Sequence, residues 1–216
     1  MTASRTLLQP PPLGLNREDG EAMLGRAFEE DPLIVHATPD ADAERRRATA
    51  ARIQGGVLRY ALRYGKVDYL SDMGALAIWL PPEEPHMTLP RMIRTGALAV
   101  PFALGFEPVR RLWRYSRVKE ALRREATDGP HWYLLILAVD PQRQHSGVGR
   151  TLLGLGLARA DAGWYPSYLE TLKEENVSFF ERHGFKVKGS AWLPNGGPRV
   201  WAMVRPPRGA RARVAS

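Results

Sequence analysis

The stretch "AVDPQRQHSGVGRTLLG", residues 138–154, decides how the chain is organised. An apolar run that is typical of a buried strand ends at Pro141, a short polar loop follows, and Gly147 and Gly149 open a predicted helix. The first N–H groups of a helix have no partner within it, and the helix dipole favours negative charge beside them. Because glycine has no Cβ, a ligand can approach this backbone closely. The stretch therefore predicts a strand–loop–helix unit that holds an anion.

Two well-known phosphate-binding loops do not match the sequence. A Walker loop requires G-x-x-x-x-G-K-[ST], and no such string occurs in the chain. A dinucleotide-binding loop requires G-x-G-x-x-G after a strand, but "GLGLAR" at 154–159 lacks the third glycine and lies inside the predicted helix. The motif that remains is Gln144-x-x-Gly147-x-Gly149, preceded by Val139-x-Pro141.

Composition limits the class of protein. The 216 residues are 44% hydrophobic and 25% charged, which is typical of one globular domain. The sequence has no apolar run of about 18 residues and no apolar signal-peptide core near its start, so we expect a cytoplasmic protein without a membrane partner. Cysteine is absent, which excludes disulfides and thiolate metal sites, and we expect no metal. The net charge of +8 comes without a nucleic-acid-binding motif, so we expect no nucleic-acid partner.

Hydrophobic periodicity predicts one α/β domain over residues 16–206, between an irregular lead-in (1–15) and a basic, disordered tail (207–216). Pro32 is expected to stop the first helix. The predicted helices cover residues 16–31, 43–65, 86–126 (interrupted near Pro101), 147–163 and 174–184. The predicted strands cover residues 66–72, 74–82, 131–141, 167–172, 185–193 and 198–206. This order indicates a mixed sheet flanked by helices.

The motif Gln144-x-x-Gly147-x-Gly149 resembles the acyl-coenzyme A signature, [QR]-x-x-G-x-[GA], of the GNAT family of N-acetyltransferases. A second block, "LETLKEENVSFFERHGFKV" at 169–187, is similar to a later motif of that family, in which a strand precedes an asparagine and an aromatic-E-R-x-G-F string. The resemblance implies a single-domain α/β GNAT fold with a mostly antiparallel sheet. It also implies acetyl transfer from acetyl-CoA to an amine.

Three further segments are similar to the puromycin N-acetyltransferase branch of the family: "AFEEDPLIVHATPD" (27–40), "GALAIWLPP" (74–82) and "PNGGPRVWAMVRPP" (194–207). That branch carries a helical insertion between its third and fourth strands, where this chain has residues 86–126. The resemblance implies a small-molecule amine as the acceptor, with a protein or peptide amine as an alternative, and a monomer or homodimer. We expect the insertion to cover the acceptor site or to form a dimer contact.

The resemblance also implies an acetyl-CoA-binding core over residues 131–187. In the family, the strands that correspond to 131–139 and 167–172 splay apart at a bulge, where the backbone meets the pantetheine arm and the thioester oxygen. The residues implied for acetyl-CoA binding are Leu137, Ala138, Val139, Gln144, His145, Ser146, Gly147, Val148, Gly149, Arg150, Asn176 and Phe180.

One catalytic position departs from the family pattern. Phe180 stands where the family usually has a tyrosine whose hydroxyl protonates the departing thiolate. Three alternatives follow. The thiolate leaves without help, since a thiol pKa is about 8.5; or His183 or Tyr168 replaces the acid; or the protein binds acetyl-CoA without turnover. As general base we expect Glu170, in the middle of the strand 167–172.

The acceptor side carries fewer signals. Asp31 is a candidate for acceptor binding or base catalysis, although its position before Pro32 also suits a turn or a helix cap. Trp79 and Tyr133 are expected either to wall the acceptor pocket or to pack in the core.

Overall fold

The apolar run after residue 131 forms the strand β3 (Trp132–Val139), which lies in the interior of a sheet. A strand that is apolar on both faces needs cover on both sides. The computed structural model describes residues 15–96 and 104–209, and in it the strands follow the order β1-β2-β3-β4-β6-β5. The predicted lead-in and tail lie almost wholly outside the described residues, so they stay predictions.

The sheet is mixed and mostly antiparallel, as the sequence predicts. Within the described residues, β3 and β4 are parallel, whereas every other pair of neighbouring strands is antiparallel. The remaining strands are β1 (Lys66–Tyr69), β2 (Ala75–Leu80), β4 (Ser167–Thr171), β5 (Lys186–Trp192) and β6 (Arg199–Arg205).

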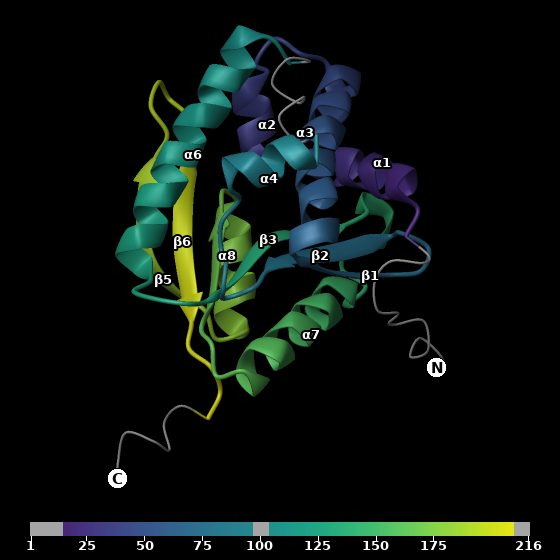
Figure 1. Cartoon of the computed structure of the whole chain (residues 1–216). Coiled ribbons are helices and arrows are strands. Elements are labelled where there is room, and N and C mark those ends of the chain that lie inside the picture. Colours follow the sequence, from purple (N-terminus) through teal and green to yellow (C-terminus); the bar gives the residue numbers. More distant parts are fainter. Residues whose placement is uncertain (1–14, 97–103, 210–216) are drawn as a thin grey trace.

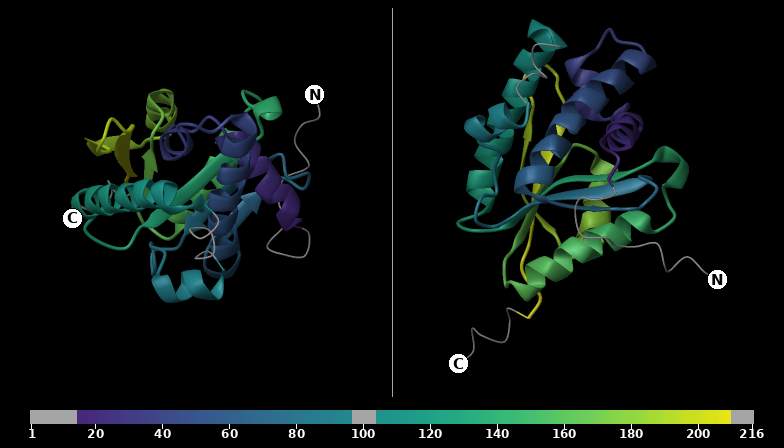
Figure 2. Two further views of the ribbon diagram at one scale, coloured as in Figure 1. Left: turned by 90° about the horizontal axis from the view of Figure 1, so that it is seen from above. Right: turned by 45° about the vertical axis from the view of Figure 1, so that its right-hand side comes forward.

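Helices cover both faces of the sheet (Figure 1). The α3 face is covered by α1 (Arg17–Phe28), α3 (Ala43–Tyr64) and α6 (Phe106–Ala126). The α7 face is covered by α7 (Val148–Ala162) and α8 (Glu174–Arg182). The right-hand view of Figure 2 shows α1 and α3 on one side of the sheet and α7 on the other. One apolar core therefore lies on each side of the strands.

Pro32 begins a helix that the sequence does not predict, whereas the helix predicted over 16–31 is present but ends three residues earlier than expected. The helix α1 ends at Phe28, and the short helix α2 (Pro32–Ala37) starts at the proline. The carboxylate of Asp31 accepts a hydrogen bond from the Leu33 N–H (3.0 Å), which caps α2. Proline fits the first position of a helix because its missing N–H has no partner to lose there.

The insertion lies between β2 and β3. Its described parts are α4 (Leu89–Arg94) and α6, and residues 97–103 fall outside the described range. α6 packs beside β5 and β6, with Leu122 buried against the α3 face (Figure 1). The insertion is therefore part of the cover of this face.

The sheet splits between β3 and β4. Their pairing runs from Trp132 opposite Ser167 to Leu134 opposite Leu169 and ends there, although β3 continues to Val139. The register between β2 and β3 also shifts at this point, which leaves Leu135 as a bulge residue. A bulge bends its strand and increases the local twist. The splay that the sequence predicts between these two strands is therefore present.

Trp79 on β2 is fully buried beneath α7, where Gly156 faces it. A Cβ on Gly156 would overlap the indole ring, whereas a Cβ on Gly154, on the same helix, would meet nothing within 4 Å. We expect Gly156→Ala to lower the free energy of unfolding by about 1–3 kcal/mol through overpacking. Gly154→Ala is the control, and its gain in helix propensity should leave stability unchanged or raise it by up to about 1 kcal/mol. Denaturant unfolding of both variants checks this, and equal stability would contradict the packing of Trp79.

Candidate active site

The loop after β3 is fastened to two other elements through Asp140. Its carboxylate accepts hydrogen bonds from Nε and Nη2 of Arg26 on α1 (2.9 and 2.6 Å) and from the Gln142 N–H (3.1 Å). The Asp140 N–H donates to the carbonyl of Gly74 (2.9 Å), in the turn between β1 and β2. Because this residue also caps the short 3₁₀ helix η1 (Pro141–Arg143), the direction in which the loop leaves the sheet is fixed.

The glycines of the loop leave its backbone open. Gly147 is the N-cap residue of α7 and has a φ of 84°, in the left-handed region that favours glycine. A Cβ there would meet nothing within 4 Å. At Gly149 the added Cβ would lie 3.3 Å from a methyl group of Val139, so this glycine lets α7 start close to β3. The first turn of α7 therefore presents its N–H groups to open space.

A cleft of about 670 Å³, the loop cleft, lies between this loop and α8 on the α7 face. Every residue that the resemblance implies for acetyl-CoA binding lines it, except Ala138. That residue is buried in the core of the α3 face, because alternate residues of a strand point to opposite faces. The cleft is lined by Leu137, Val139, Arg143, Gln144, His145, Ser146, Gly147, Val148, Gly149, Arg150, Asn176, Phe179, Phe180, Arg182 and His183.

The cleft is basic at its rim. Arg150 and Arg182 are exposed and line it, whereas Arg143 also pairs with Asp72 (2.6 Å). Arg182 was missed by sequence reasoning. Its position one residue after Glu181 in the second motif was the available signal.

The structure brings His183 beside Phe180 but keeps Tyr168 away from both. Phe180 is buried at the wall of the loop cleft, with its ring edge-on to Phe185 (5.7 Å between centroids). His183 lines the same cleft, and its Nδ1–H donates to the carbonyl of Phe179 (2.8 Å), which leaves Nε2 as the available ring nitrogen. Tyr168 is fully buried on the α3 face, where its hydroxyl donates to Glu170. It is therefore not placed to serve the loop cleft.

A second cavity of about 390 Å³, the acidic cavity, lies on the α3 face beneath α6. Asp31, Tyr133 and Glu170 meet here, although they are distant in the sequence. Trp79 does not, since it is fully buried under α7 on the other face, so its assignment to the acceptor pocket is not supported. The cavity is lined by Asp31, Leu33, Ile53, Gln54, Gly56, Val57, Met87, Met92, Val109, Leu112, Trp113, Tyr115, Ser116, Lys119, Tyr133, Leu135, Glu170 and Leu172.

Most of the apolar wall, and the residues Tyr115 and Lys119, were missed by sequence reasoning. Part of that wall, together with Tyr115 and Lys119, comes from the insertion, whose helix α6 lines the cavity with one stripe. Leu112, Tyr115 and Lys119 follow one another at three- and four-residue spacing, as residues on one helix face do. The available signal in the sequence was a lysine within the apolar stripe of the helix, which indicates a polar role for that position.

Glu170 is the most heavily hydrogen-bonded side chain of the acidic cavity. It accepts hydrogen bonds from the hydroxyls of Tyr133 and Tyr168, the latter at 2.8 Å. Burial raises the pKa of Glu170, while the charge of Lys119 and the two hydroxyls act in the opposite direction. Burial and the Glu170 charge raise the pKa of both tyrosines, so their hydroxyls stay protonated and continue to donate. Burial likewise raises the pKa of Asp31, against the Leu33 N–H.

The loop cleft and the acidic cavity are joined by β3. Leu137 and Val139 line the cleft, whereas Tyr133 and Leu135 line the cavity. Because the bulge at Leu135 adds one residue to β3, the odd-numbered residues before and after it point to opposite faces of the sheet. The split between β3 and β4 thus lies between a basic cleft on one face and a carboxylate-bearing cavity on the other. This geometry can bring an anionic ligand and a cationic ligand together across one sheet.

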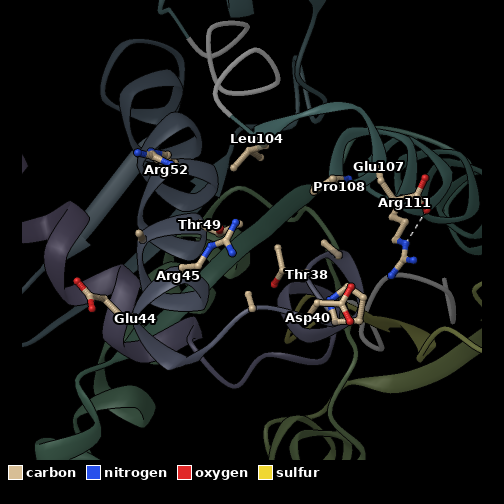
Figure 3. Close-up of a pocket in the computed structure, with 14 residues that line it drawn as sticks. Thr38, Asp40, Glu44, Arg45, Thr49, Arg52, Leu104, Glu107, Pro108 and Arg111 are labelled. Atoms are coloured by element: carbon tan, nitrogen blue, oxygen red, sulfur yellow. Dashed lines mark hydrogen bonds and ion pairs between the residues drawn. The ribbon is translucent and has the colours of Figure 1, made fainter.

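A third cavity, of about 480 Å³, lies between α2, the first half of α3 and the start of α6 (Figure 3). Its lining mixes charges: Arg45 extends into it from α3, and Arg111 is paired with Glu107 (3.0 Å). None of the residues predicted for the site lines it.

Among the described ranges, no helix is long and apolar enough to cross a membrane.

Comparison with known proteins agrees with this geometry. Residues 114–187 match the family model described as an acetyltransferase (GNAT) domain. A solved structure described as histone acetyltransferase HPA2 and related acetyltransferase, from Corynebacterium glutamicum, is 23% identical with a TM-score of 0.64, covering 94% of this chain and 96% of that one. The structure of PH1933 from Pyrococcus horikoshii is 12% identical with a TM-score of 0.51, covering 92% and 94%. These likenesses show the fold, and the matched model supports the GNAT acetyltransferase domain family.

The Arg26–Asp140 contact should make stability depend on pH. Burial raises the pKa of Asp140, but the hydrogen bonds from Arg26 and Gln142 and the charges of Arg26 and Arg143 outweigh it, so the pKa is lowered. The contribution is therefore complete above the ordinary pKa of 3.8 and is lost as the pH falls through the lowered value.

We expect Asp140→Asn to lower the free energy of unfolding by about 1 kcal/mol at neutral pH, with a difference that shrinks below about pH 4. Urea unfolding across pH measures it. Asp19→Asn, exposed on α1, is the control and should change little. A difference that does not depend on pH would contradict this account of Asp140.

Proposed function

We propose that the protein is an acetyl-CoA-dependent N-acetyltransferase that acetylates an amine of a small molecule. The observation that carries the proposal is the split between β3 and β4, which joins an anion-suited cleft on one face to an acidic cavity on the other. Direct transfer between two bound molecules requires that they be held close and in line. At the split, a molecule bound in the loop cleft and one bound in the acidic cavity can meet from opposite faces of the sheet.

The loop cleft fits the cofactor. The open N–H groups at the start of α7, with Arg150 and Arg182 at the rim, suit a pyrophosphate. The backbone of β3 beyond Leu134, which β4 does not pair, suits an extended arm, with Asn176 facing it from α8. When bound, acetyl-CoA supplies an activated acetyl thioester.

The acidic cavity suits a small amine. Its volume lies near the lower end of the range for small-ligand pockets. The two carboxylates attract an ammonium group, and the apolar wall suits an apolar body. Because α6 covers this cavity, it suits a small molecule better than a peptide. Since the sequence resembles the puromycin N-acetyltransferase branch, puromycin is the first acceptor to test.

Two proton transfers complete the reaction. Glu170 accepts the proton that the amine loses, and Tyr133 and Tyr168 hold its carboxylate in place. On the other face Phe180 has no hydroxyl to give the thiolate a proton. His183 is the candidate acid whose side chain reaches the cleft, and departure without help is the alternative.

A silent acetyl-CoA-binding protein is the second candidate function. The observation that favours it is Phe180, which places a ring without a hydroxyl at the wall of the loop cleft. Binding without transfer to any amine would support this alternative. We further propose a cytoplasmic protein that is a monomer or a homodimer.

Binding of acetyl-CoA should depend on the open backbone at Gly147. In calorimetric titration we expect the wild type to bind acetyl-CoA and Gly147→Trp to lose binding, because the indole would cover the start of α7. The positive φ adds strain of about 1–2 kcal/mol, so the variant should stay folded. Gly196→Trp, also at a positive φ with free space around it, is the control that should bind normally. Normal binding by Gly147→Trp would mean that the cofactor site lies elsewhere.

Transfer should depend on the Glu170 carboxylate. We expect Glu170→Gln to lower kcat by about 10²–10⁴-fold while leaving acetyl-CoA affinity unchanged. Wild-type activity should fall as the pH drops through the raised pKa of Glu170, since protonation removes the base, and the variant should lack this limb.

The measurement is thiol release with puromycin, benzylamine, tyramine, spermidine and a peptide with a free N-terminus. Glu125→Gln, exposed on α6, is the control. Unchanged turnover in Glu170→Gln would remove this residue from the mechanism. Preference for the peptide would refute the small-molecule acceptor.

A further inference from the structure

Lys119 is a charged group of the acidic cavity to which the proposed proton transfers give no role. Among the described residues that line this cavity, it is the one basic side chain. Its Nζ lies 5.3 Å from the centroid of the Tyr133 ring and 5.8 Å from that of Tyr115. No salt bridge between Lys119 and a carboxylate occurs within residues 15–96 and 104–209. The ammonium is held against two aromatic rings instead.

Packing alone does not require a lysine at this position. Apart from Ser116, the other residues of α6 that line the cavity are apolar or aromatic, with Leu112 and Tyr115 before Lys119, and Leu122 continues the helix face into the core. A methionine or leucine would continue the stripe, whereas the half-buried Lys119 brings a positive charge to the edge of the cavity. The ammonium is stabilised there by the faces of two aromatic rings. The charge itself is therefore the feature to explain.

Tyr133 connects the ammonium to Glu170. The face of its ring lies beneath Lys119, and its hydroxyl donates to the Glu170 carboxylate. A cation on this side favours the charged form of the carboxyl group, and Lys119 opposes the rise in the pKa of Glu170 that burial causes.

The other charged and titratable groups near Glu170 do not replace Lys119. Tyr168 and Tyr115 are neutral hydroxyls with raised pKa values. Asp31 lines the same cavity and adds negative charge rather than removing it. The charge of Arg123, further along α6, also lowers the pKa of Glu170, but Arg123 is already paired with Glu120 (2.8 Å). Lys173 acts on Asp31 and does not line the cavity. Among the described residues that line the cavity, Lys119 is thus the cation that faces Glu170 without a salt bridge of its own.

We propose that Lys119 is a positioning residue for the transfer reaction, which acts through Tyr133 to keep Glu170 in its charged, proton-accepting form. This inference rests on the proposed role of Glu170 as the base. It gives the insertion a chemical role, because α6 then supplies part of the machinery as well as the cover of the acceptor cavity.

The pH profile of transfer distinguishes this role from a structural one. The probes are benzylamine and 2,2,2-trifluoroethylamine, and the second stays unprotonated over the range, so its profile reports a group of the protein. We expect Lys119→Met to lower kcat/KM about tenfold at the acidic end of the profile and by less than about twofold at its alkaline end, because a rising pH favours the ionised Glu170 in both proteins. Lys119→Arg should restore the wild-type profile.

Arg117→Met is the matched control, since Arg117 lies on the same helix over the Trp113 ring (5.2 Å) but does not line the cavity. It should leave the profile unchanged. A Lys119→Met profile that overlays the wild type, or that falls equally at every pH, would overturn the inference.

A double-mutant cycle tests the same link without turnover. Unfolding of the wild type, Lys119→Met, Glu170→Gln and the double variant is measured at pH 8 and pH 5. We expect Lys119→Met to destabilise the wild type more than the Glu170→Gln protein at pH 8, with less coupling at pH 5, because a lower pH favours the protonated form of Glu170. Additive effects at both pH values would overturn the inference, whereas a wild type that acetylates no amine would instead refute the proposed function.

Discussion

Both candidate sites depend on the point at which backbone pairing between β3 and β4 ends. The parallel ladder stops at Leu134 and Leu169, and the bulge at Leu135 bends β3 away from its neighbour. β3 then continues to Val139 without β4 beside it, in the interior of the sheet. An unpaired strand edge normally lies at the border of a sheet, where it meets solvent or another chain. Here it lies between two covered faces, so a ligand from either face can reach it.

The two faces differ in charge, and this difference orders the proposed reaction. The loop cleft offers open helix N–H groups and arginines, whereas the acidic cavity offers Asp31 and Glu170. An anionic donor is therefore favoured in the loop cleft and a cationic acceptor in the acidic cavity. The sheet between them keeps each molecule out of the other's site. Because burial works against the charged form of Glu170, the cavity needs partners that restore it, and Tyr133, Tyr168 and Lys119 all act in that direction.

The loop cleft could be predicted from sequence because its information is local. Gln144, Gly147 and Gly149 lie within six consecutive residues, and their spacing alone indicates open backbone at a helix start. The mixed sheet and most element boundaries followed from periodicity for the same reason. Asp31 shows the limit, since its capping of α2 was visible beside Pro32 but its place in the same cavity as Glu170 was not. Trp79 shows the same limit: the sequence left open whether it lines the acceptor pocket or packs in the core, because an aromatic side chain on a strand looks the same in sequence in both cases, and in the structure it packs against a glycine of the covering helix.

The acceptor side resists such prediction because distant elements build it. Its wall combines the cap of α2, the middle of α3, the insertion and two strands, and none of these carries a motif by itself. The chemistry at its floor is nonetheless anchored in the sheet, since Tyr133, Tyr168 and Glu170 lie on paired strands. Substitutions in α4 and α6 can therefore reshape the wall without moving the proton acceptor. Lys119 is the exception: it belongs to the helical cover, but in the proposed role it acts on the floor of the cavity, so a change there would alter the chemistry as well as the fit.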